Sequence, residues 1–348
     1  MKKLIINTAN DELFIVLKKD NDIFSVSINS KMHHNETMLP QIDELLKQHN
    51  LNVDDIGEFG VVIGPGSFTG IRVGIATIKA FRDATGAKAI GVNNLDYLFA
   101  LAKNKNPNVE TVAINGSRDS YFVAKLIHGV VYKYEHNLTL SELIEVADNQ
   151  PIGMFKADGN LDCFVVDQDE KVLLNCVENS GDETLVPVYY QLSQAESEKL
   201  KRSEILIEVA TVDDLNEIAT IEKENILTNT MNKNQIQECL NGENYACFKA
   251  VFDNEVVGFV MLNKSDELNI DSVAVKKEFR NLGIATKLIE KAETYAKEHK
   301  IETLSLEVAY TNVTAYLLYK KLGFVERRTR KNYYKNGDDA IEMIKRVD

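Results

Sequence analysis

The sequence predicts an α/β fold divided into two domains, and three observations lead to this prediction. The chain has 348 residues, whereas a typical domain holds about 100 to 200. Short apolar runs typical of strands alternate with longer runs of helical periodicity in both halves. A polar stretch without Gly or Pro separates the halves and reads as a linker. We therefore expect domains over residues 1–195 and 205–348, joined by a linker over 196–204.

The first domain begins with strands and continues with alternating helices and strands. Apolar runs bounded by polar turns predict the strands, and one-sided apolar periodicity predicts the helices. The expected strands are Leu4–Ile6, Leu13–Leu17, Ile23–Ile28, Phe59–Ile63 and Ala89–Val92, and the expected helices are Thr37–His49 and Ile71–Thr85. This order resembles the ribonuclease-H-like half-domain of the actin/Hsp70 class, which has three strands followed by a helix, a strand, a helix and a strand.

The loop Gly64–Gly70 is the sharpest feature of this half. It reads G-P-G-S-F-T-G and is followed by Ile-Arg-Val-Gly. This sequence resembles the TsaB family, whose members assist in making threonylcarbamoyladenosine on tRNA. The resemblance implies a non-catalytic scaffold that binds a TsaD-like catalytic partner, works with its TsaE-like ATPase and meets tRNA only indirectly. The residues that it assigns to the partner interface are Gly66, Ser67, Gly70, Arg72 and Gly74.

Two details of the residues favour a scaffold over an ATPase. No Lys precedes a Ser or Thr at the start of the helix, as the Walker pattern requires. Asn7 stands where the kinase class carries an Asp, and a neutral amide cannot supply a charge to Mg²⁺. The spacing of Gly70 and Gly74 leaves two interpretations open: a small stripe for a partner helix, or close packing inside the domain.

The second domain is expected to hold a strand over Ile205–Val209 and a helix over Val212–Glu224. Thr211 is a credible N-cap for this helix. Further along, a strand over Asn269–Val275 precedes a turn of the form R-x-x-G-x-A and a helix over Ala285–Lys297. A strand that enters a helix through small residues leaves backbone N–H groups pointing at one spot, where they suit a pyrophosphate. An ordinary strand-to-helix turn is the alternative.

A second motif, C-terminal to this turn, is more specific. After a second strand over Leu304–Val308, the residues Asn312, Ala315, Tyr319, Gly323 and Phe324 are spaced as N-x-x-A-x-x-x-Y-x-x-x-G-F. This order resembles the GNAT acetyltransferases, which transfer acetyl groups from acetyl-CoA. The end of the chain, with R-K-N-Y-Y over 330–334, resembles the RimI group, which acetylates the alanine N-terminus of a ribosomal protein.

The GNAT resemblance assigns roles to individual residues. The turn would hold the pyrophosphate of acetyl-CoA, the preceding strand would pair with the pantetheine arm, and Asn312 would touch the coenzyme. The cofactor-binding residues are therefore Val273, Ala274, Val275, Arg280, Asn281, Leu282, Gly283, Ile284, Ala285, Thr286 and Asn312. Glu307 matches the base and Tyr319 the acid of the family. Without the resemblance, Glu307 would read as a surface carboxylate, Tyr319 as a core aromatic and Asn312 as an N-cap.

The acceptor is left open by the sequence. A protein α-amine, with a pKa near ~7.7–8.0, needs only a modest base to lose its proton. The RimI group usually carries a Pro-Trp segment after its first helix, but this chain has no Trp. Three hypotheses remain: a fused TsaB–RimI protein acting on ribosomal alanine, an acetyltransferase with another amine acceptor, and an assembly module that only binds coenzyme A.

Composition excludes several other classes. The net charge of −13 argues against direct binding to nucleic acid. No apolar run approaches the ~18 residues of a membrane span. Four Cys without a C-x-x-C pair and six scattered His predict a reduced, cytoplasmic protein without a metal site. The basic run over 327–335 reads first as a solvated hairpin and second as a contact for an acidic partner or substrate.

Overall fold

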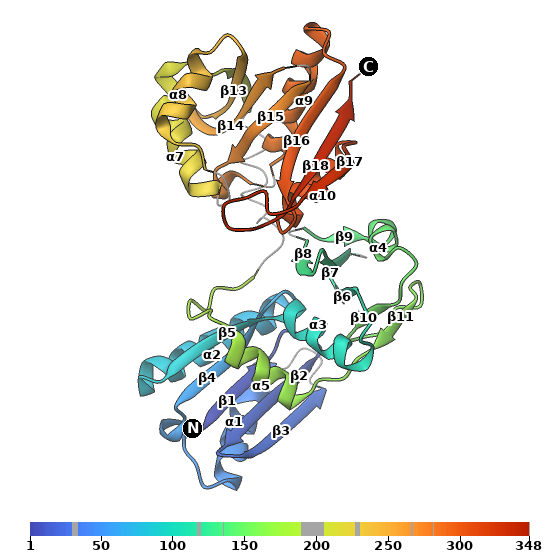
Figure 1. The fold of residues 1–348 in the computed structure, drawn as a ribbon. Coiled ribbons are helices and arrows are strands. Elements are labelled where there is room, and N and C mark those ends of the chain that lie inside the picture. Colours follow the sequence, from blue (N-terminus) through green and yellow to red (C-terminus); the bar gives the residue numbers. More distant parts are fainter. Residues whose placement is uncertain are drawn as a thin grey trace. The chain divides into compact units, whose positions relative to one another are not determined.

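The computed structural model describes residues 1–29, 34–116, 120–134, 136–188, 205–226, 230–265, 267–280 and 282–347. The chain divides into two compact units, Met1–Gln191 and Leu192–Asp348 (Figure 1). The predicted division into two α/β domains is thus confirmed. The predicted linker over 196–204 lies outside the described residues, so its bounds stay a prediction.

Unit 1 contains a five-stranded sheet in the order β3-β2-β1-β4-β5. Strand β2 is antiparallel to its neighbours, whereas β1, β4 and β5 run parallel. The elements of this half are β1 (Lys3–Asn7), β2 (Glu12–Lys19), β3 (Asp22–Asn29), α1 (His34–Gln48), β4 (Glu58–Gly64), α2 (Phe68–Thr85), β5 (Lys88–Asn93) and α3 (Asn94–Lys105). This is the predicted ribonuclease-H-like topology.

The second half of unit 1 repeats this topology, which the sequence pattern did not predict. Its sheet has the order β11-β10-β6-β7-β8, with β6, β10 and β11 parallel and β7 antiparallel. Its elements are β6 (Thr111–Asn115), β7 (Ser120–Ile127), β8 (Val130–Lys133), β9 (Leu138–Thr139), α4 (Leu140–Ala147), β10 (Ile152–Met154), β11 (Cys163–Val165) and α5 (Glu170–Asn179). No helix joins β10 to β11 among these residues, so the counterpart of α2 is missing.

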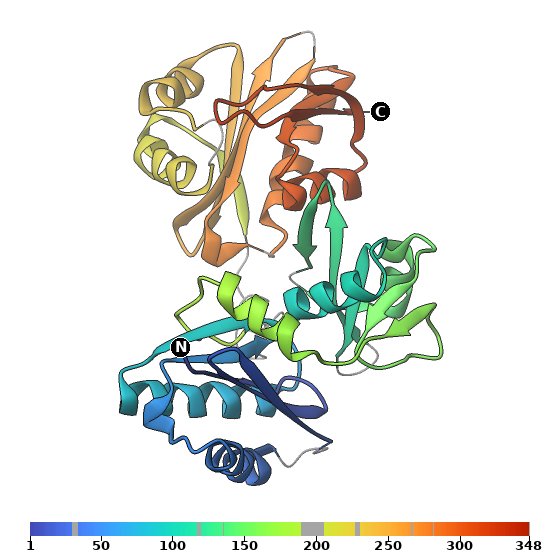
Figure 2. The ribbon, with the colours of Figure 1, turned by 60° about the horizontal axis from the view of Figure 1, so that its bottom comes forward.

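The helices of unit 1 lie in separate layers (Figure 2). Helices α1 and α2 cover one face of the first sheet, and α3 lies between the two sheets with α5 beside it. Buried apolar residues of both halves form one continuous core that includes Tyr97 of α3. Unit 1 is therefore a pair of ribonuclease-H-like halves, as in the actin class.

Unit 2 is built on a seven-stranded sheet in the order β12-β13-β14-β15-β16-β18-β17. Its pairing is antiparallel throughout, except between β15 and β16. The elements are β12 (Leu206–Val209), α7 (Leu215–Asn225), α8 (Lys233–Asn241), β13 (Tyr245–Phe252), β14 (Glu255–Lys264), β15 (Leu268–Val275), α9 (Ile284–Glu298), β16 (Thr303–Ala309), α10 (Val313–Lys321), β17 (Val325–Arg330) and β18 (Ala340–Arg346).

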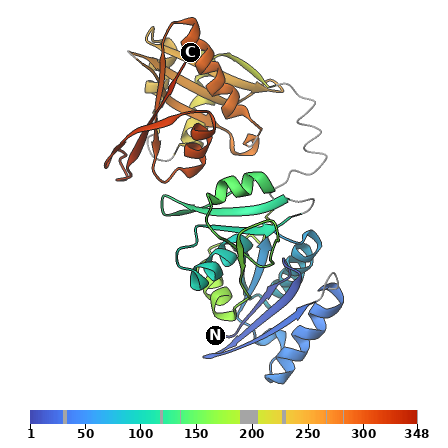
Figure 3. The same ribbon diagram turned by 90° about the vertical axis from the view of Figure 1, so that its right-hand side faces the viewer.

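Helices cover both faces of this sheet (Figure 3). Helices α9 and α10 pack on one face over a core that includes Leu288 and Tyr319. Helices α7 and α8 pack on the other face around Ile221 and Ile236. None of the helices in the described residues is long and apolar enough to cross a membrane.

All four predicted helices begin at other residues than expected: α1 begins at His34 rather than Thr37, and α9 begins at Ile284 rather than Ala285. Helix α2 begins at Phe68 rather than Ile71, because the Ser67 hydroxyl accepts a hydrogen bond from the Gly70 N–H at 3.2 Å. Helix α7 begins at Leu215, because Val212–Asp214 form a short 3₁₀ turn. The Thr211 N–H donates to the Asp214 carboxylate at 2.8 Å and so fixes this turn.

Candidate active site

The parallel strands β15 and β16 part in the middle of the unit 2 sheet. They pair only from Leu268–Ile270 to Leu304–Leu306, although β15 continues to Val275 and β16 to Ala309. Beyond this point β15 still pairs with β14, and β16 with β18. The β16-facing edge of β15 is therefore left without a partner strand within the described residues, and an extended ligand can pair with it.

Helix α9 begins directly after this open edge. Gly283 precedes the helix with φ +74°, a left-handed conformation that glycine adopts at no steric cost. Gly283, the N-cap residue, makes no side-chain cap hydrogen bond, and the space where a Gly283 side chain would lie is empty. The first N–H groups of α9 are thus available to an anion, as expected for a pyrophosphate site.

Arg280 is the one charged side chain of the predicted turn. It is exposed, and its guanidinium donates to the Asn225 side chain at 2.8 Å and to the Val275 carbonyl at 3.4 Å. The turn is thereby tied to the end of α7. Asn281 lies outside the described residues, so its predicted contact with the coenzyme stays a prediction.

Glu307 lies on β16 at the opening between the strands. Its side chain is 18% exposed, and the Arg330 Nη1 lies 3.3 Å from its Oε1. Burial raises the pKa of Glu307 above its ordinary value, while Arg330 lowers it and the charges of Glu342 and Asp271 raise it further. A half-buried carboxylate with a raised pKa is a suitable base for an amine.

Glu342 faces Glu307 across the strand pair β16–β18 and was not predicted from the sequence. Its carboxylate is buried and binds Arg328 at 2.7 Å, Arg330 at 2.9 Å and Arg327 at 3.2 Å. Burial works to raise the pKa of Glu342, but the three guanidinium groups outweigh it and hold the pKa below its ordinary value. In the sequence, the one feature that could have predicted a buried carboxylate partner was the group of three Arg residues on one short strand.

These ion pairs change the interpretation of the basic run over 327–335. The hairpin is present as β17 and β18, but its cations are not simply solvated. Arg327 also binds Glu267, and Lys331 binds Asp339 at 2.6 Å. Because these charges are neutralised inside unit 2, they form part of the site's framework rather than a free basic surface.

Tyr319 lies on α10 and is buried, with its ring centroid 5.8 Å from that of Phe324. Burial raises the pKa of Tyr319 to about 12. Burial also raises the pKa of Tyr334, and the neighbouring charges of Tyr333, Glu307 and Tyr319 add to this effect. Glu307 and Tyr319 both act on the pKa of Tyr334, and their roles as base and acid stay predictions.

Asn312 is the N-cap of α10. Its side-chain oxygen accepts a hydrogen bond from the Ala315 N–H at 3.2 Å. Asn312 thus caps the helix, which was the interpretation of this residue without the family resemblance. Its contact with the coenzyme stays a prediction.

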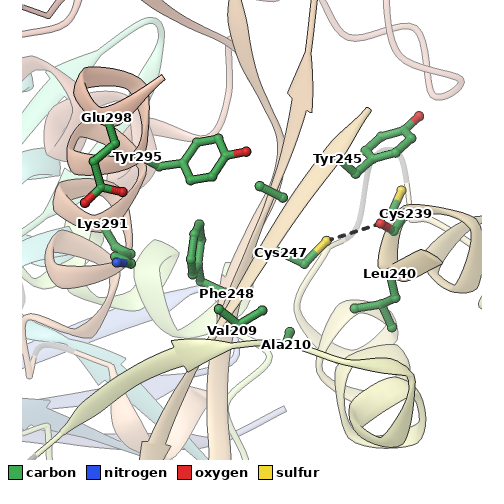
Figure 4. Close-up of a pocket in the computed structure, with 11 residues that line it drawn as sticks. Val209, Ala210, Cys239, Leu240, Tyr245, Cys247, Phe248, Lys291, Tyr295 and Glu298 are labelled. Atoms are coloured by element: carbon green, nitrogen blue, oxygen red, sulfur yellow. Dashed lines mark hydrogen bonds between the residues drawn. The ribbon is translucent and has the colours of Figure 1, made fainter. Parts of the chain in front are cut away.

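The pocket drawn in Figure 4 lies elsewhere in unit 2. It has a volume of about 380 Å³, and α8, β13 and α9 supply most of its walls. Phe248, Lys291 and Tyr295 point toward one another on one side, and Cys239 and Cys247 lie on the other (Figure 4). None of the predicted site residues lines it, so it is separate from the candidate active site.

In unit 1, the predicted partner residues divide into buried and exposed groups. Gly66, Gly70 and Gly74 face Thr8 and Ala9, and side-chain carbons at these glycines would lie 1.9–2.4 Å from oxygen atoms of those two residues. Close packing of α2 on the end of β1 explains why Gly70 and Gly74 are small. Ser67 and Arg72 are exposed, so their predicted place at a partner interface stays a prediction.

Exposed apolar side chains also occur on helices α1 and α2. Phe68 is 55% exposed at the start of α2, and the Arg72 guanidinium lies 3.9 Å from the centre of its ring. Leu39 on the neighbouring helix α1 is 49% exposed. Large exposed apolar side chains are candidates for an interaction surface.

Asn7 is held inside unit 1 by hydrogen bonds. Its Nδ2 donates to the Gln168 Oε1 at 2.8 Å, and its Oδ1 accepts from the Ala9 N–H at 3.0 Å. The side chain is fully buried. The position that carries an Asp in the kinase class is thus a neutral bridge between the two halves.

Comparison with known families agrees with this architecture. The family model "Acetyltransferase (GNAT) family" matches residues 212–324. The model "tRNA N6-adenosine threonylcarbamoyltransferase" (TsaD) matches residues 26–144.

Individual relatives fall into the same two groups. An N-alpha-acetyltransferase of Saccharolobus solfataricus is 30% identical over 163 residues, which cover 43% of this chain and 97% of the relative. A [ribosomal protein bS18]-alanine N-acetyltransferase of Salmonella typhimurium is 33% identical over 106 residues, covering 29% of this chain and 72% of the relative. A Pseudomonas aeruginosa crystal structure, described as similar to peptidase YeaZ, is 18% identical with a TM-score of 0.45 and covers 55% of this chain and 99% of that chain. The chain therefore belongs to the GNAT acetyltransferase family through its second unit, which has RimI-like relatives, and it joins this N-acetyltransferase to a first unit that the TsaD family model matches in part.

Proposed function

We propose that unit 2 acetylates the α-amine of protein N-termini, with ribosomal alanine as the first candidate acceptor. One observation carries the proposal: the open edge of β15 lies beside the uncapped N-terminus of α9, and Glu307 stands where the strands part. Relatives that acetylate protein N-termini support it. Acceptance of a different amine is the alternative that remains.

The described residues fit acetyl-CoA at this place. The N–H groups at the start of α9 would hold the pyrophosphate, and the edge of β15 from Val273 to Val275 would pair with the pantetheine arm. Arg280, tied to Asn225, would fix the turn. Acetyl-CoA supplies the acetyl group as a reactive thioester.

Glu307 would accept the proton that the acceptor amine must lose before it attacks. The raised pKa of Glu307 brings its basicity closer to that of an α-amine, which eases the transfer. Tyr319 would donate a proton to the departing sulfur. Because burial raises the pKa of Tyr319 to about 12, its hydroxyl stays protonated at neutral pH.

A peptide panel tests this function. Acetyl transfer would be measured on peptides with free N-terminal Ala, Ser, Met or Gly, and on one peptide with a blocked N-terminus and an internal Lys. Preference for Ala supports the RimI-type acceptor. Preference for Lys, or for none of these peptides, overturns the N-terminal assignment. Replacing Glu307 by Gln should lower kcat about 10²- to 10⁴-fold while acetyl-CoA binding persists.

We also propose that unit 1 docks a TsaD-like protein through α1 and α2, as a TsaB-type scaffold for tRNA threonylcarbamoylation. The exposed Phe68, Arg72 and Leu39 support a docking surface here, and the buried Asn7–Gln168 bridge supports a non-catalytic role.

Binding to a purified TsaD-like protein, measured by calorimetry, tests the docking surface. The F68A variant should weaken binding by at least about tenfold, because a central aromatic commonly dominates an interface. The matched control is I144A, which removes another exposed apolar side chain of unit 1, 49% exposed on α4. Equal affinity of F68A and I144A would place the interface elsewhere.

A further inference from the structure

Asp271 lies where β15 leaves β16. The β14–β15 register pairs Leu262 with Ile270 but Met261 with Ser272, so Asp271 is the extra residue of a β-bulge. The pairing of β15 with β16 ends one residue earlier, at Ile270. Bulges next to active sites re-aim side chains. The bulge thus puts Asp271 at the mouth of the opening that contains Glu307.

One amide group links Asp271 to Glu307. The Asn269 Nδ2 donates to the Asp271 Oδ1 at 2.7 Å, and Asn269 is also one of the groups that lower the pKa of Glu307. The Ser305 hydroxyl donates to the Asn269 Oδ1 at 3.1 Å and fixes the direction in which the amide points. Asn269 pairs with Ser305 across the sheet, so it lies two residues from Asp271 on β15 and its partner lies two residues from Glu307 on β16.

The two carboxylates differ in their counter-charges. Glu307 is paired with Arg330. Asp271 is bound only by the amides of Asn269 and Asn263, and among the described residues no Lys, Arg or His forms an ion pair with it. The Asp271 side chain is exposed to solvent. Nearby protein atoms still desolvate its carboxylate enough to raise its pKa. A solvent-facing carboxylate without a cation, beside the base of an N-acetyltransferase, fits a cationic group of the acceptor.

We propose that Asp271 binds the ammonium form of the acceptor amine and presents it to Glu307. The inference rests on the proposed function, because it takes Glu307 as the base. Asp271 would act as a specificity-determining residue that favours acceptors with a free, charged amine.

The proposed step balances with Asp271 unchanged. The ammonium group gives one proton to the Glu307 carboxylate, and the nitrogen lone pair then forms a C–N bond to the acetyl carbon. The C–S bond breaks, and the sulfur takes a proton from Tyr319. The nitrogen gives up its second proton to the Tyr319 oxygen, which leaves a neutral amide and restores the phenol. Asp271 attracts the ammonium but not the neutral amine. Its charge therefore contributes to acceptor binding and not to the bond-forming step.

Removing the charge of Asp271 also has a consequence for pH dependence. Asp271 is one of the charges that raise the pKa of Glu307, so an uncharged residue at 271 should move the acid limb of activity to lower pH. The substitution leaves the other charged or titratable residues around the pair in place. They are Arg330, Glu342, Tyr333, Tyr334, Cys239, Tyr245 and Cys247.

Two inhibitor peptides separate a charge contact from a structural effect. One is an accepted peptide with a dimethylated N-terminus, which is charged at neutral pH but cannot be acetylated. The other carries a hydroxyl in place of the amine and is neutral. Inhibition constants would be measured on the full chain, with saturating acetyl-CoA, for wild type, Asp271→Asn, Asp271→Glu and the control Asp213→Asn, an exposed Asp elsewhere in unit 2.

Asp271→Asn should raise the inhibition constant of the charged peptide about tenfold and raise KM for the acceptor by a similar factor. The inhibition constant of the neutral peptide should stay the same. Asp271→Glu should restore much of the affinity for the charged inhibitor, and Asp213→Asn should behave as wild type. Equal weakening of both inhibitors, or no weakening, overturns the proposal. A wild-type protein that acetylates no peptide would instead contradict the proposed function, so the two failures are distinguishable.

Discussion

At the scale of single residues, Arg330 is shared between two carboxylates that face each other across β16 and β18. Like charges directly opposite destabilise a strand pair, and the Arg330 guanidinium bridges them. Its charge lowers the pKa of Glu307. Replacing Arg330 by Gln should raise this pKa, so that the base stays protonated to higher pH.

The expected result for Arg330→Gln is an acid limb of kcat/KM displaced to higher pH, opposite in sign to Asp271→Asn. The measurement is the pH profile of acetyl transfer at saturating acetyl-CoA. Lys331→Gln is the control, because Lys331 forms its ion pair among the described residues with Asp339 and not with Glu307. A limb that stays in place, or moves to lower pH, would show that Arg330 does not set the basicity of Glu307.

Gly283 allows a second test at this scale. With φ +74° and empty space above it, an Ala at this position meets no clash but bears the strain of a left-handed conformation, about 1–2 kcal/mol. Gly283→Ala should therefore cost about that much stability and weaken acetyl-CoA binding, measured by calorimetry.

Gly86 offers a matched control for Gly283, since it has φ +71° and equally open surroundings at the end of α2. Gly86→Ala should show the same loss of stability with unchanged acetyl-CoA affinity. If both variants bind acetyl-CoA as wild type does, the turn before α9 is not the pyrophosphate site.

At the scale of elements, α2 approaches β1 closely because Gly70 has no side chain. A side-chain carbon there would lie 1.9 Å from the Thr8 carbonyl oxygen, and backbone atoms cannot yield as a flexible side chain can. Gly70→Ala should destabilise unit 1 by about 2 kcal/mol. Urea unfolding measures this, with the unobstructed Gly159→Ala as the neutral control. A stable Gly70→Ala protein would mean that α2 packs on β1 less tightly than this distance implies.

The elements also show how far sequence reasoning reaches. Strong periodicity and turn chemistry predicted the first half of unit 1 and most of the strands around the opening in unit 2. The second half of unit 1 was missed because β10 and β11 have three residues each and β8 is nowhere fully buried. Strands of three residues are too short to show periodicity, and a strand that is half-buried on both faces does not alternate between apolar and polar residues.

The residues of the candidate site also differ in whether the sequence could predict them. The turn before α9, Glu307 and Tyr319 belong to a local spacing that the sequence displays directly. Asp271 and Glu342 do not, because their roles depend on a bulge and on pairing across strands distant in the chain. Their partners, Asn269 and Arg330, lie on different strands from Glu307, and no spacing within one segment brings these side chains together.

At the scale of the whole molecule, each unit has cores of its own. The apolar clusters of unit 1 and those of unit 2 are built from separate stretches of the chain. A ligand that binds one folded unit stabilises that unit by mass action, by about 2.7 kcal/mol at about 100 times its Kd. For a unit of this size that corresponds to roughly 5–10 °C in Tm.

Calorimetry of the full chain should therefore show two unfolding transitions, with acetyl-CoA raising only one of them. Gly283→Ala should reduce this shift, whereas Gly70→Ala should lower the other transition and leave the acetyl-CoA response intact. These two variants assign each transition to its unit without cutting the chain. A single transition, or a rise of both transitions with acetyl-CoA, would show that unit 1 and unit 2 are energetically coupled. Coenzyme binding in unit 2 would then also stabilise the docking surface proposed for α1 and α2.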